Sequence, residues 1–262
     1  MVDAHGKDNI PTISAIGLLA YFSGDIGHHA LGHGAACLAS GGQVSMLSSI
    51  FVDCTRTGTG IDLSGPLANL LIGLLALLVG RVLRQPSLAM RLFLILVAAF
   101  NLLWFAMQLA FSALTRTDDW AWAMHELHVT GPIRAGMIVV GALLYLTTVR
   151  LTAAELAPLA HPPARVRTII LTAWLTAGAL ACATAALDHH PLAAILRHAA
   201  PQSLANSIGL LFVPRLTAKM PISNDIATPI ASSRAWVVAA GIAAATSIIL
   251  LGPGIAIPLP SG

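Results

Sequence analysis

The chain has 262 residues, of which 56% are hydrophobic and 10% are charged, and its mean hydropathy is +0.81. Soluble domains are usually about 25% charged and still expose much of their surface to water, so this composition excludes a soluble globular protein. The basic residues stand mainly at the ends of apolar runs, so the net charge of +3 does not indicate nucleic-acid binding. The chain also lacks the glycine patterns of common nucleotide sites. The partner we expect is the lipid bilayer.

Six apolar runs are long enough to cross a bilayer, which takes about 17–25 helical residues. They are residues 13–39, 63–83, 92–114, 133–149, 166–187 and 235–251. A further stretch, 192–213, is apolar only in part, and its Arg197, Pro201 and Gln202 favour an interfacial or re-entrant helix. The expected fold class is therefore an all-α integral membrane protein with about six transmembrane helices, multi-pass in the cell (inner) membrane.

The segment after the first run predicts a short β-hairpin. Gly41-Gly42 is typical of a helix end, and residues 43–52 are rich in β-branched and small polar side chains. Cys37 and Cys182 fall inside predicted spans and Cys54 falls in a loop, so no disulfide framework is expected.

We expect one polytopic membrane domain over residues 1–262, with a motif-bearing core in 1–130 and further spans and a tail in 131–262. Its orientation follows from arginines in two loops, which are Arg81, Arg84 and Arg91 in one and Arg150, Arg165 and Arg167 in the other. The positive-inside rule predicts that both loops are cytoplasmic. The C-terminal end of the first helix then lies on the opposite side, together with the loop of Asp118 and Asp119.

The segment 24–42 carries the residues with metal chemistry. His29 and His33 are four residues apart, so on an α-helix they share one face, and two imidazoles at that spacing form a common chelating pair for zinc. Asp25 lies one turn earlier on that face, where it could hydrogen-bond His29 or act as a ligand itself. On an α-helix His28 points about 100° away. The alternative to a metal site is a structural role, in which these histidines pack between helices and hydrogen-bond to carbonyls. Polar groups clustered in a span are, however, usually functional.

Two motifs resemble the site-2 protease family of intramembrane zinc metallopeptidases. His29-Ala30-Leu31-Gly32-His33, followed by Gly41-Gly42-Gln43-Val44, is similar to the family segment H-E-L-G-H…G-G-x-V. Ser64-Gly65-Pro66-Leu67-Ala68-Asn69 is similar to its small-G-P-x-x-N segment. The resemblance covers residues 24–78 and implies one zinc ion, hydrolysis of peptide bonds, and transmembrane helices of other proteins as partners. In the family this end of the helix generally faces the cytoplasm, the side opposite to the one that the arginines indicate.

The resemblance also implies a third ligand, an aspartate from a later helix, and a role for Asn69 in orienting substrate. Asp119 is the best candidate for the ligand and Asp118 is the second. An N-cap role for the helix that follows is the alternative, and one aspartate could fill each role. The expected metal site is thus His29, His33 and Asp119.

The chain departs from the family at residue 30. Here Ala30 stands in place of the motif glutamate, which transfers protons in the family. Glu126 is a weak candidate to replace it, and His28 is another. Whether the chain is an enzyme therefore stays open between a working zinc endopeptidase and a proteolytically inactive relative that binds or regulates membrane proteins.

Two other classes of function fit the histidines less well. A di-iron membrane oxidase needs repeated H-x-x-H-H boxes, and none of the histidine pairs here has that full form. A proton or metal transporter could use Asp25, His28, His29 and His33 as a relay.

Overall fold

The computed structural model describes residues 7–84, 86–160, 162–220 and 228–257. Six helices within these ranges are long and apolar enough to cross a membrane, and each overlaps one of the six predicted runs. They are α1 (Ile10–Ile26), continued by η1 (Gly27–Gly34) and α2 (Ala35–Ala39); α3 (Thr59–Val82); α4 (Leu88–Thr115); α6 (Gly131–Leu156); α7 (Pro163–Ala185); and α10 (Arg234–Ala245), continued by η5 (Thr246–Leu251).

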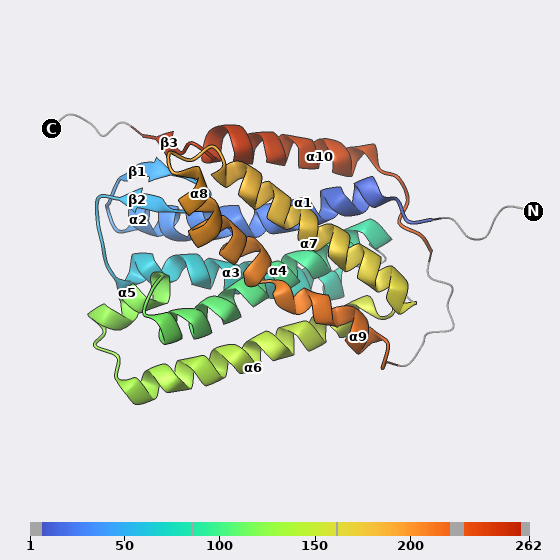
Figure 1. The fold of residues 1–262 in the computed structure, drawn as a ribbon, viewed down its shortest axis with the longest axis horizontal. Coiled ribbons are helices and arrows are strands. Elements are labelled where there is room, and N and C mark those ends of the chain that lie inside the picture. The colour runs from blue at the N-terminus through green and yellow to red at the C-terminus, as the bar shows by residue number, and fades with distance from the viewer. Residues whose placement is uncertain (1–6, 85, 161, 221–227, 258–262) are drawn as a thin grey trace, which may run out of the picture.

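Helix α4 forms the centre of the bundle, where it packs against α1, α3 and α6 (Figure 1). Its side chains Leu96 and Leu103 are completely buried, as are Ile16 of α1 and Ile170 of α7. The outer helices instead present large apolar side chains to the surroundings, as Leu71, Leu75 and Leu78 of α3 do. A face of this kind is rare on soluble proteins, so it indicates a multi-pass membrane protein.

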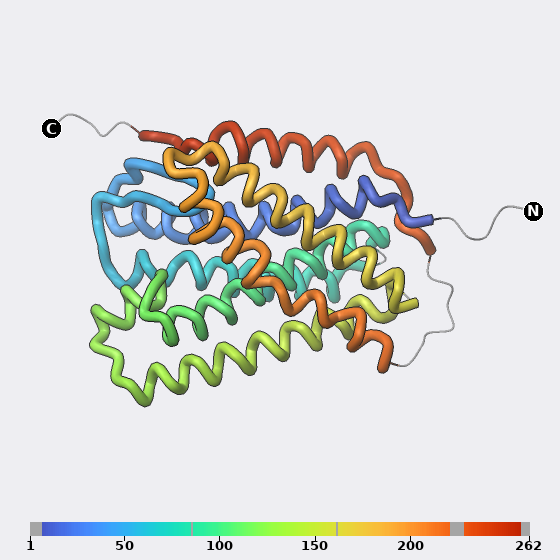
Figure 2. The backbone as a smooth tube through the Cα atoms, viewed as in Figure 1, coloured from blue at the N-terminus to red at the C-terminus, as the bar shows by residue number. Residues whose placement is uncertain are grey.

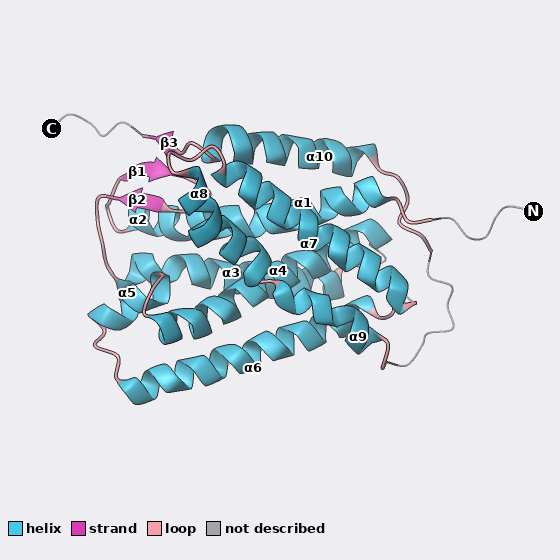
Figure 3. Cartoon of the chain, in the orientation of Figure 1, coloured by secondary structure: helices cyan, strands magenta, loops and turns pink. Residues whose placement is uncertain are grey.

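A small antiparallel sheet closes one end of the bundle (Figure 3). Its strands are β1 (Val44–Leu47), β2 (Val52–Cys54) and β3 (Ile255–Ala256), in the order β2-β1-β3. The predicted hairpin is therefore present, and the C-terminal segment adds a third strand to it. The short helix α5 (Asp119–Glu126) lies at the same end, and the N-terminal end of α1 lies at the other (Figure 1).

The expectation of no disulfide is wrong, because Cys37 and Cys54 are bonded, with their Cα atoms 5.9 Å apart. The hairpin turns the chain back so that the end of β2 meets α2 at the end of the first span. Sequence separation alone does not show this, since the two positions are 17 residues apart. The bond ties the sheet to the helix that carries the histidines.

The stretch predicted to be interfacial or re-entrant forms a broken helix that runs along α7 from the sheet end towards the other end (Figures 1 and 2). Its pieces are α8 (Pro191–Ala194), η2 (Ile195–Ala199), η3 (Pro201–Ala205), η4 (Ile208–Phe212) and α9 (Val213–Thr217). Pro201 cannot donate a backbone hydrogen bond, which explains one of the breaks. Irregular helix of this kind is tolerated at membrane depth where it is buried in protein or lines a cavity.

Candidate metal centre

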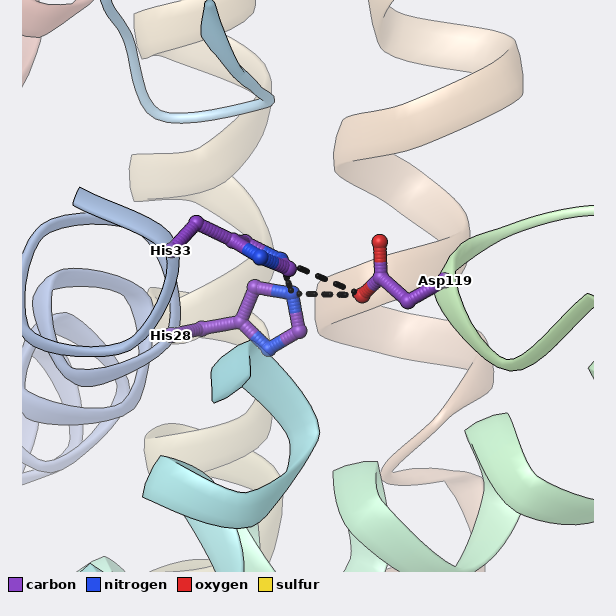
Figure 4. Close-up of side chains that lie close together, drawn as sticks. All are labelled: His28, His33 and Asp119. Carbon is purple, nitrogen blue, oxygen red and sulfur yellow. Dashed lines mark hydrogen bonds and ion pairs between the residues drawn. The ribbon is translucent and has the colours of Figure 1, made fainter. Parts of the chain in front are cut away.

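Three side chains from separate parts of the fold converge on one point: His28 and His33 from η1, and Asp119 from the first turn of α5 (Figure 4). The Nε2 atoms of the two histidines are 3.2 Å apart. The Oδ2 atom of Asp119 is 3.0 Å from Nε2 of His28 and 3.3 Å from Nε2 of His33.

These separations fit a zinc ion. At zinc–ligand bonds of about 2.0–2.1 Å, a tetrahedral site places neighbouring ligand atoms about 3.3 Å apart. Two imidazoles and one carboxylate are ligands that zinc prefers. Three protein ligands, with a fourth position left for water or substrate, are the number found in catalytic rather than structural zinc sites.

A π-helix explains why the two histidines meet. Segment η1 has the sequence Gly-His-His-Ala-Leu-Gly-His-Gly and is π-helical throughout. In a π-helix the backbone bonds run from i to i+5, which brings residues five apart, such as His28 and His33, onto one face. On the α-helix assumed from the sequence, residues four apart would share the face instead. Single π-helical turns inside α-helices occur often at functional sites.

Hydrogen bonds to the outer ring nitrogens fix the proton positions of both imidazoles. His33 Nδ1 lies 2.7 Å from the carbonyl oxygen of Ile61, which can only accept, so this nitrogen carries the proton. His28 Nδ1 lies 2.6 Å from Asn69 Oδ1. The Nδ2 group of Asn69 donates to the Gly24 carbonyl at 3.2 Å and to Asn101 Oδ1 at 2.9 Å, so Oδ1 must accept from His28.

With both Nδ1 atoms protonated, the neutral imidazoles direct lone pairs from both Nε2 atoms towards the same point. The ionised carboxylate of Asp119 directs a third lone pair there. Three acceptors with no hydrogen between them repel one another, and in a buried site a cation relieves this. The donor set therefore fits a metal ion, with the outer hydrogen bonds orienting the ligands as they do in known metal sites.

The loop before α5 positions the aspartate. Asp118 is the N-cap, and its Oδ1 accepts from the backbone N–H of Asp119 at 3.1 Å. Gln108 of α4 donates from Nε2 to Asp119 Oδ2 at 2.8 Å and to Asp118 Oδ2 at 3.0 Å. Without a metal ion, burial acts to raise the pKa of Asp119, but hydrogen bonds from protonated His28 and His33 outweigh it and hold that pKa well below its usual range. A metal ion in place of those protons would also keep the carboxylate in the charged form that a ligand needs.

Glycine allows α3 to approach the histidines. A Cβ atom on Gly65 would lie 2.8 Å from Nε2 of His28 and closer still to Nε2 of His33, so any side chain there would enter the metal position. Gly32 of η1 faces Gly65 across the contact, and a Cβ on it would lie 2.6 Å from the Gly65 Cα. The two glycines let the backbones touch beside the centre.

The centre opens on a cavity of about 810 Å³. Its walls come from η1, the hairpin, the start of α3, the end of α4, α5 and the broken helix. Apolar side chains such as Phe51 and Trp122 line much of it. Arg197, Gln202 and Asn206 of the broken helix also line it, and within the described residues the buried Gln202 Oε1 has no hydrogen-bond partner.

The structure distributes the predicted site residues as follows. His33 and Asp119 belong to the convergent group, and His28 stands in it where His29 was expected. His29 lies beside it and bonds through Nδ1 to the backbone oxygen of Asp25 at 3.1 Å. Ala30 is not among the residues that line the cavity.

Two other predicted residues have roles in positioning. Asn69, expected to orient substrate, hydrogen-bonds His28. Glu126, the weak candidate for the proton-moving group, instead accepts from the Thr59 backbone N–H at 2.6 Å and ties α5 to the start of α3.

The sequence analysis did not assign three supporting residues to the site. Trp104 stacks on His28 with ring centroids 4.9 Å apart, while Gln108 holds Asp119 and Asn101 holds Asn69. The signal available was that Asn101 and Gln108 are polar residues within an apolar run, which is unusual in a span.

Comparison of the chain with protein families, with characterised proteins and with solved structures gives no match.

Proposed function

We propose that this chain is a multi-pass membrane protein of the cell membrane that binds one zinc ion at His28, His33 and Asp119 and hydrolyses peptide bonds of membrane proteins. The observation that carries the proposal is the convergence of three lone pairs on one point in the wall of a large cavity. The two motifs that resemble the site-2 protease family support the choice of reaction. The first motif contains His33 and begins directly after His28, and the second contains Gly65 and Asn69.

A zinc ion held there would polarise a peptide carbonyl and lower the pKa of a water molecule to about 7. The residues of the chain do the rest. Asn69 and the Ile61 carbonyl keep the two Nε2 lone pairs directed inwards, and Gln108 fixes the carboxylate. The apolar walls limit access of bulk water.

The cavity suits an unwound peptide segment. Cavities of about 300–1,000 Å³ hold most small ligands, and this one is near the upper end. The Oε1 atoms of Gln108 and Gln202 are buried, line the cavity and have no partner in the described parts of the chain. Peptide N–H groups would satisfy both oxygens, and Arg197 on the same wall could bind a carbonyl or carboxylate.

A proteolytically inactive relative that binds membrane helices is the second candidate, and Ala30 is the observation that favours it. Both functions need the metal, but only the first needs proton transfer.

The experiment measures zinc in the purified, detergent-solubilised protein and in two neighbouring aspartate variants. We expect about one zinc per chain in the wild type, loss of zinc in Asp119→Ala and retention in Asp118→Ala, because only Asp119 directs an oxygen at the two Nε2 atoms. Asp118 acts only on the position of Asp119, so its loss weakens the affinity without removing a ligand. Equal zinc content in the two variants would refute the ligand assignment.

Cleavage is measured on a set of fluorophore-labelled transmembrane peptides. Zinc-dependent cleavage that stops when a chelator is added supports the peptidase, whereas a zinc-loaded protein that cleaves none of them supports the inactive relative.

A further inference from the structure

The side chain of His29 faces the cavity next to the metal centre but does not join the convergent group. It is buried, and its ring centroid is 4.8 Å from that of His28 and 6.4 Å from that of His33. A buried histidine in a span is costly unless its polar atoms are used, so both of its ring nitrogens require an explanation.

One nitrogen is accounted for by Asp25. His29 Nδ1 lies 3.1 Å from the backbone oxygen of Asp25, which only accepts, so Nδ1 carries the proton and Nε2 keeps a lone pair. The structure gives Nε2 no partner within the described residues. The Oδ1 atom of Asp25 is 3.3 Å from the same Nδ1 and has no hydrogen bond of its own. A carboxylate in this place stabilises the positive charge that the imidazole gains when Nε2 takes up a proton.

We infer that His29 is the proton-transferring residue of the reaction, with Nε2 as the accepting atom and Asp25 as the residue that positions it. The inference rests on the proposed function and deepens it. In the family that the motifs resemble, the proton-moving glutamate directly follows the first histidine ligand. With His28 as the first ligand, the residue that directly follows it is His29. The identity of residue 30 then no longer decides whether a proton-transferring group is present.

The step balances in atoms and charge. The oxygen of a water molecule bonds to the carbon of the scissile carbonyl while its O–H bond breaks, and His29 Nε2 takes the proton. The imidazolium then donates this proton to the amide nitrogen as the C–N bond breaks. The products are a carboxylic acid and an amine, and His29 returns to its neutral form.

The π-helix makes this arrangement available. Because His28 and His33 share a face at a spacing of five, the residue directly after His28 is turned away from the ligand position yet stays against the same cavity. Ala30, one residue further on, does not line the cavity. We therefore expect a glutamate placed at residue 30 to start outside the cavity and not to reach the reacting atoms.

The test compares His29→Ala, His29→Glu, Ala30→Glu and the double variant His29→Ala/Ala30→Glu, and it uses three readouts. The readouts are zinc content, affinity for a peptide hydroxamate measured by calorimetry, and cleavage of labelled transmembrane peptides. A hydroxamate offers oxygens to a zinc ion and an O–H or N–H group to a neighbouring base, so its affinity reports on His29 without turnover. If His29→Ala fails to fold, His29→Gln replaces it.

We expect His29→Ala to keep its zinc, to bind the hydroxamate at least about tenfold more weakly, and to cleave about 10²–10⁴-fold more slowly in kcat with little change in KM. His29→Glu should recover much of the cleavage, because a carboxylate there can take the same proton. Ala30→Glu should not rescue His29→Ala.

Several results would overturn the inference. They are loss of zinc in His29→Ala, hydroxamate affinity and cleavage that do not depend on residue 29, and rescue of His29→Ala by Ala30→Glu. If the wild type cleaves no peptide while hydroxamate affinity still depends on His29, the proposed peptidase function fails and the placement of His29 beside the metal stands.

Discussion

Gly65 stands where a side chain would enter the space between the two imidazoles. The residue belongs to the second motif, so one family-like segment provides both the open position beside the candidate metal site and, four residues on, the amide that orients His28. At the scale of single residues, the centre thus depends on one missing side chain and one hydrogen-bond acceptor as much as on its ligands.

The first prediction concerns that missing side chain. Gly65→Ala should abolish zinc binding, because its Cβ would overlap the Nε2 atoms of both histidines. Gly60→Ala is a matched control in the same helix, since a Cβ there meets nothing within 4 Å. Elemental analysis of the two purified variants checks this, and normal zinc in Gly65→Ala would show that the metal is bound elsewhere.

The second prediction concerns Asn69, which is completely buried. Asn69→Ala removes the acceptor of His28 Nδ1–H, and loss of such an outer hydrogen bond typically costs about 10–100-fold in metal affinity. Asn206→Ala, which changes an amide that lines the cavity away from the ligands, should leave the affinity unchanged. Competition with a fluorescent zinc chelator measures both affinities; similar values for the two variants would contradict the role given to Asn69.

The sequence alone was enough to locate the segment of the candidate site, together with His33, Asp119 and the helices that are long and apolar enough to span a bilayer. It could not identify His28 as a candidate ligand. The spacing of two residues shows whether they share a helix face only after a helix type is assumed, and the α-helix is the usual assumption. The π-helical turn depends on tertiary contacts such as that of Gly32 with Gly65, which no local pattern displays. The support from Trp104 and Gln108 depends in the same way on how α4 packs.

At the scale of elements, the hairpin and the broken helix enclose the cavity on the sides that the six spans leave open. The disulfide between Cys37 and Cys54 joins the hairpin to the end of the histidine helix. In the chain-entropy model, a bond that closes a loop of this length stabilises the folded protein by about 3 kcal/mol. The bond therefore holds one wall of the cavity against the metal centre.

The third prediction is that the protein as purified has one reactive thiol, that of Cys182, and three after reduction. A thiol-reactive dye applied to the denatured protein with and without reductant counts them. The double variant Cys37→Ser/Cys54→Ser should unfold at a lower temperature than the wild type, while Cys182→Ser should not. Three thiols without reductant would show that the bond does not form.

At the scale of the whole molecule, the disulfide and the charges indicate the same orientation. Disulfides persist in oxidising compartments, and this one lies at the end of the bundle with the sheet and the metal centre. Arginines gather at the opposite end, around the connections from α3 to α4 and from α6 to α7, mostly in the adjoining ends of these helices. We expect that end to be cytoplasmic, so the metal and the substrate would reach the centre from the other side.

The fourth prediction tests this orientation with single cysteines in a Cys182→Ser background. His189→Cys, in the loop after α7, should react with a membrane-impermeant maleimide on intact cells, whereas Ser87→Cys, in the loop before α4, should react only after permeabilisation. The reverse pattern would place the centre on the cytoplasmic side, as in the family that the motifs resemble.

The most direct test of the metal centre compares zinc content in the wild type, His28→Ala and His29→Ala, each with its folding checked by circular dichroism. The π-helical geometry predicts about one zinc per chain in the wild type, none in His28→Ala and an unchanged amount in His29→Ala. Zinc that is lost in His29→Ala and kept in His28→Ala would contradict the account and return the ligands to α-helical spacing.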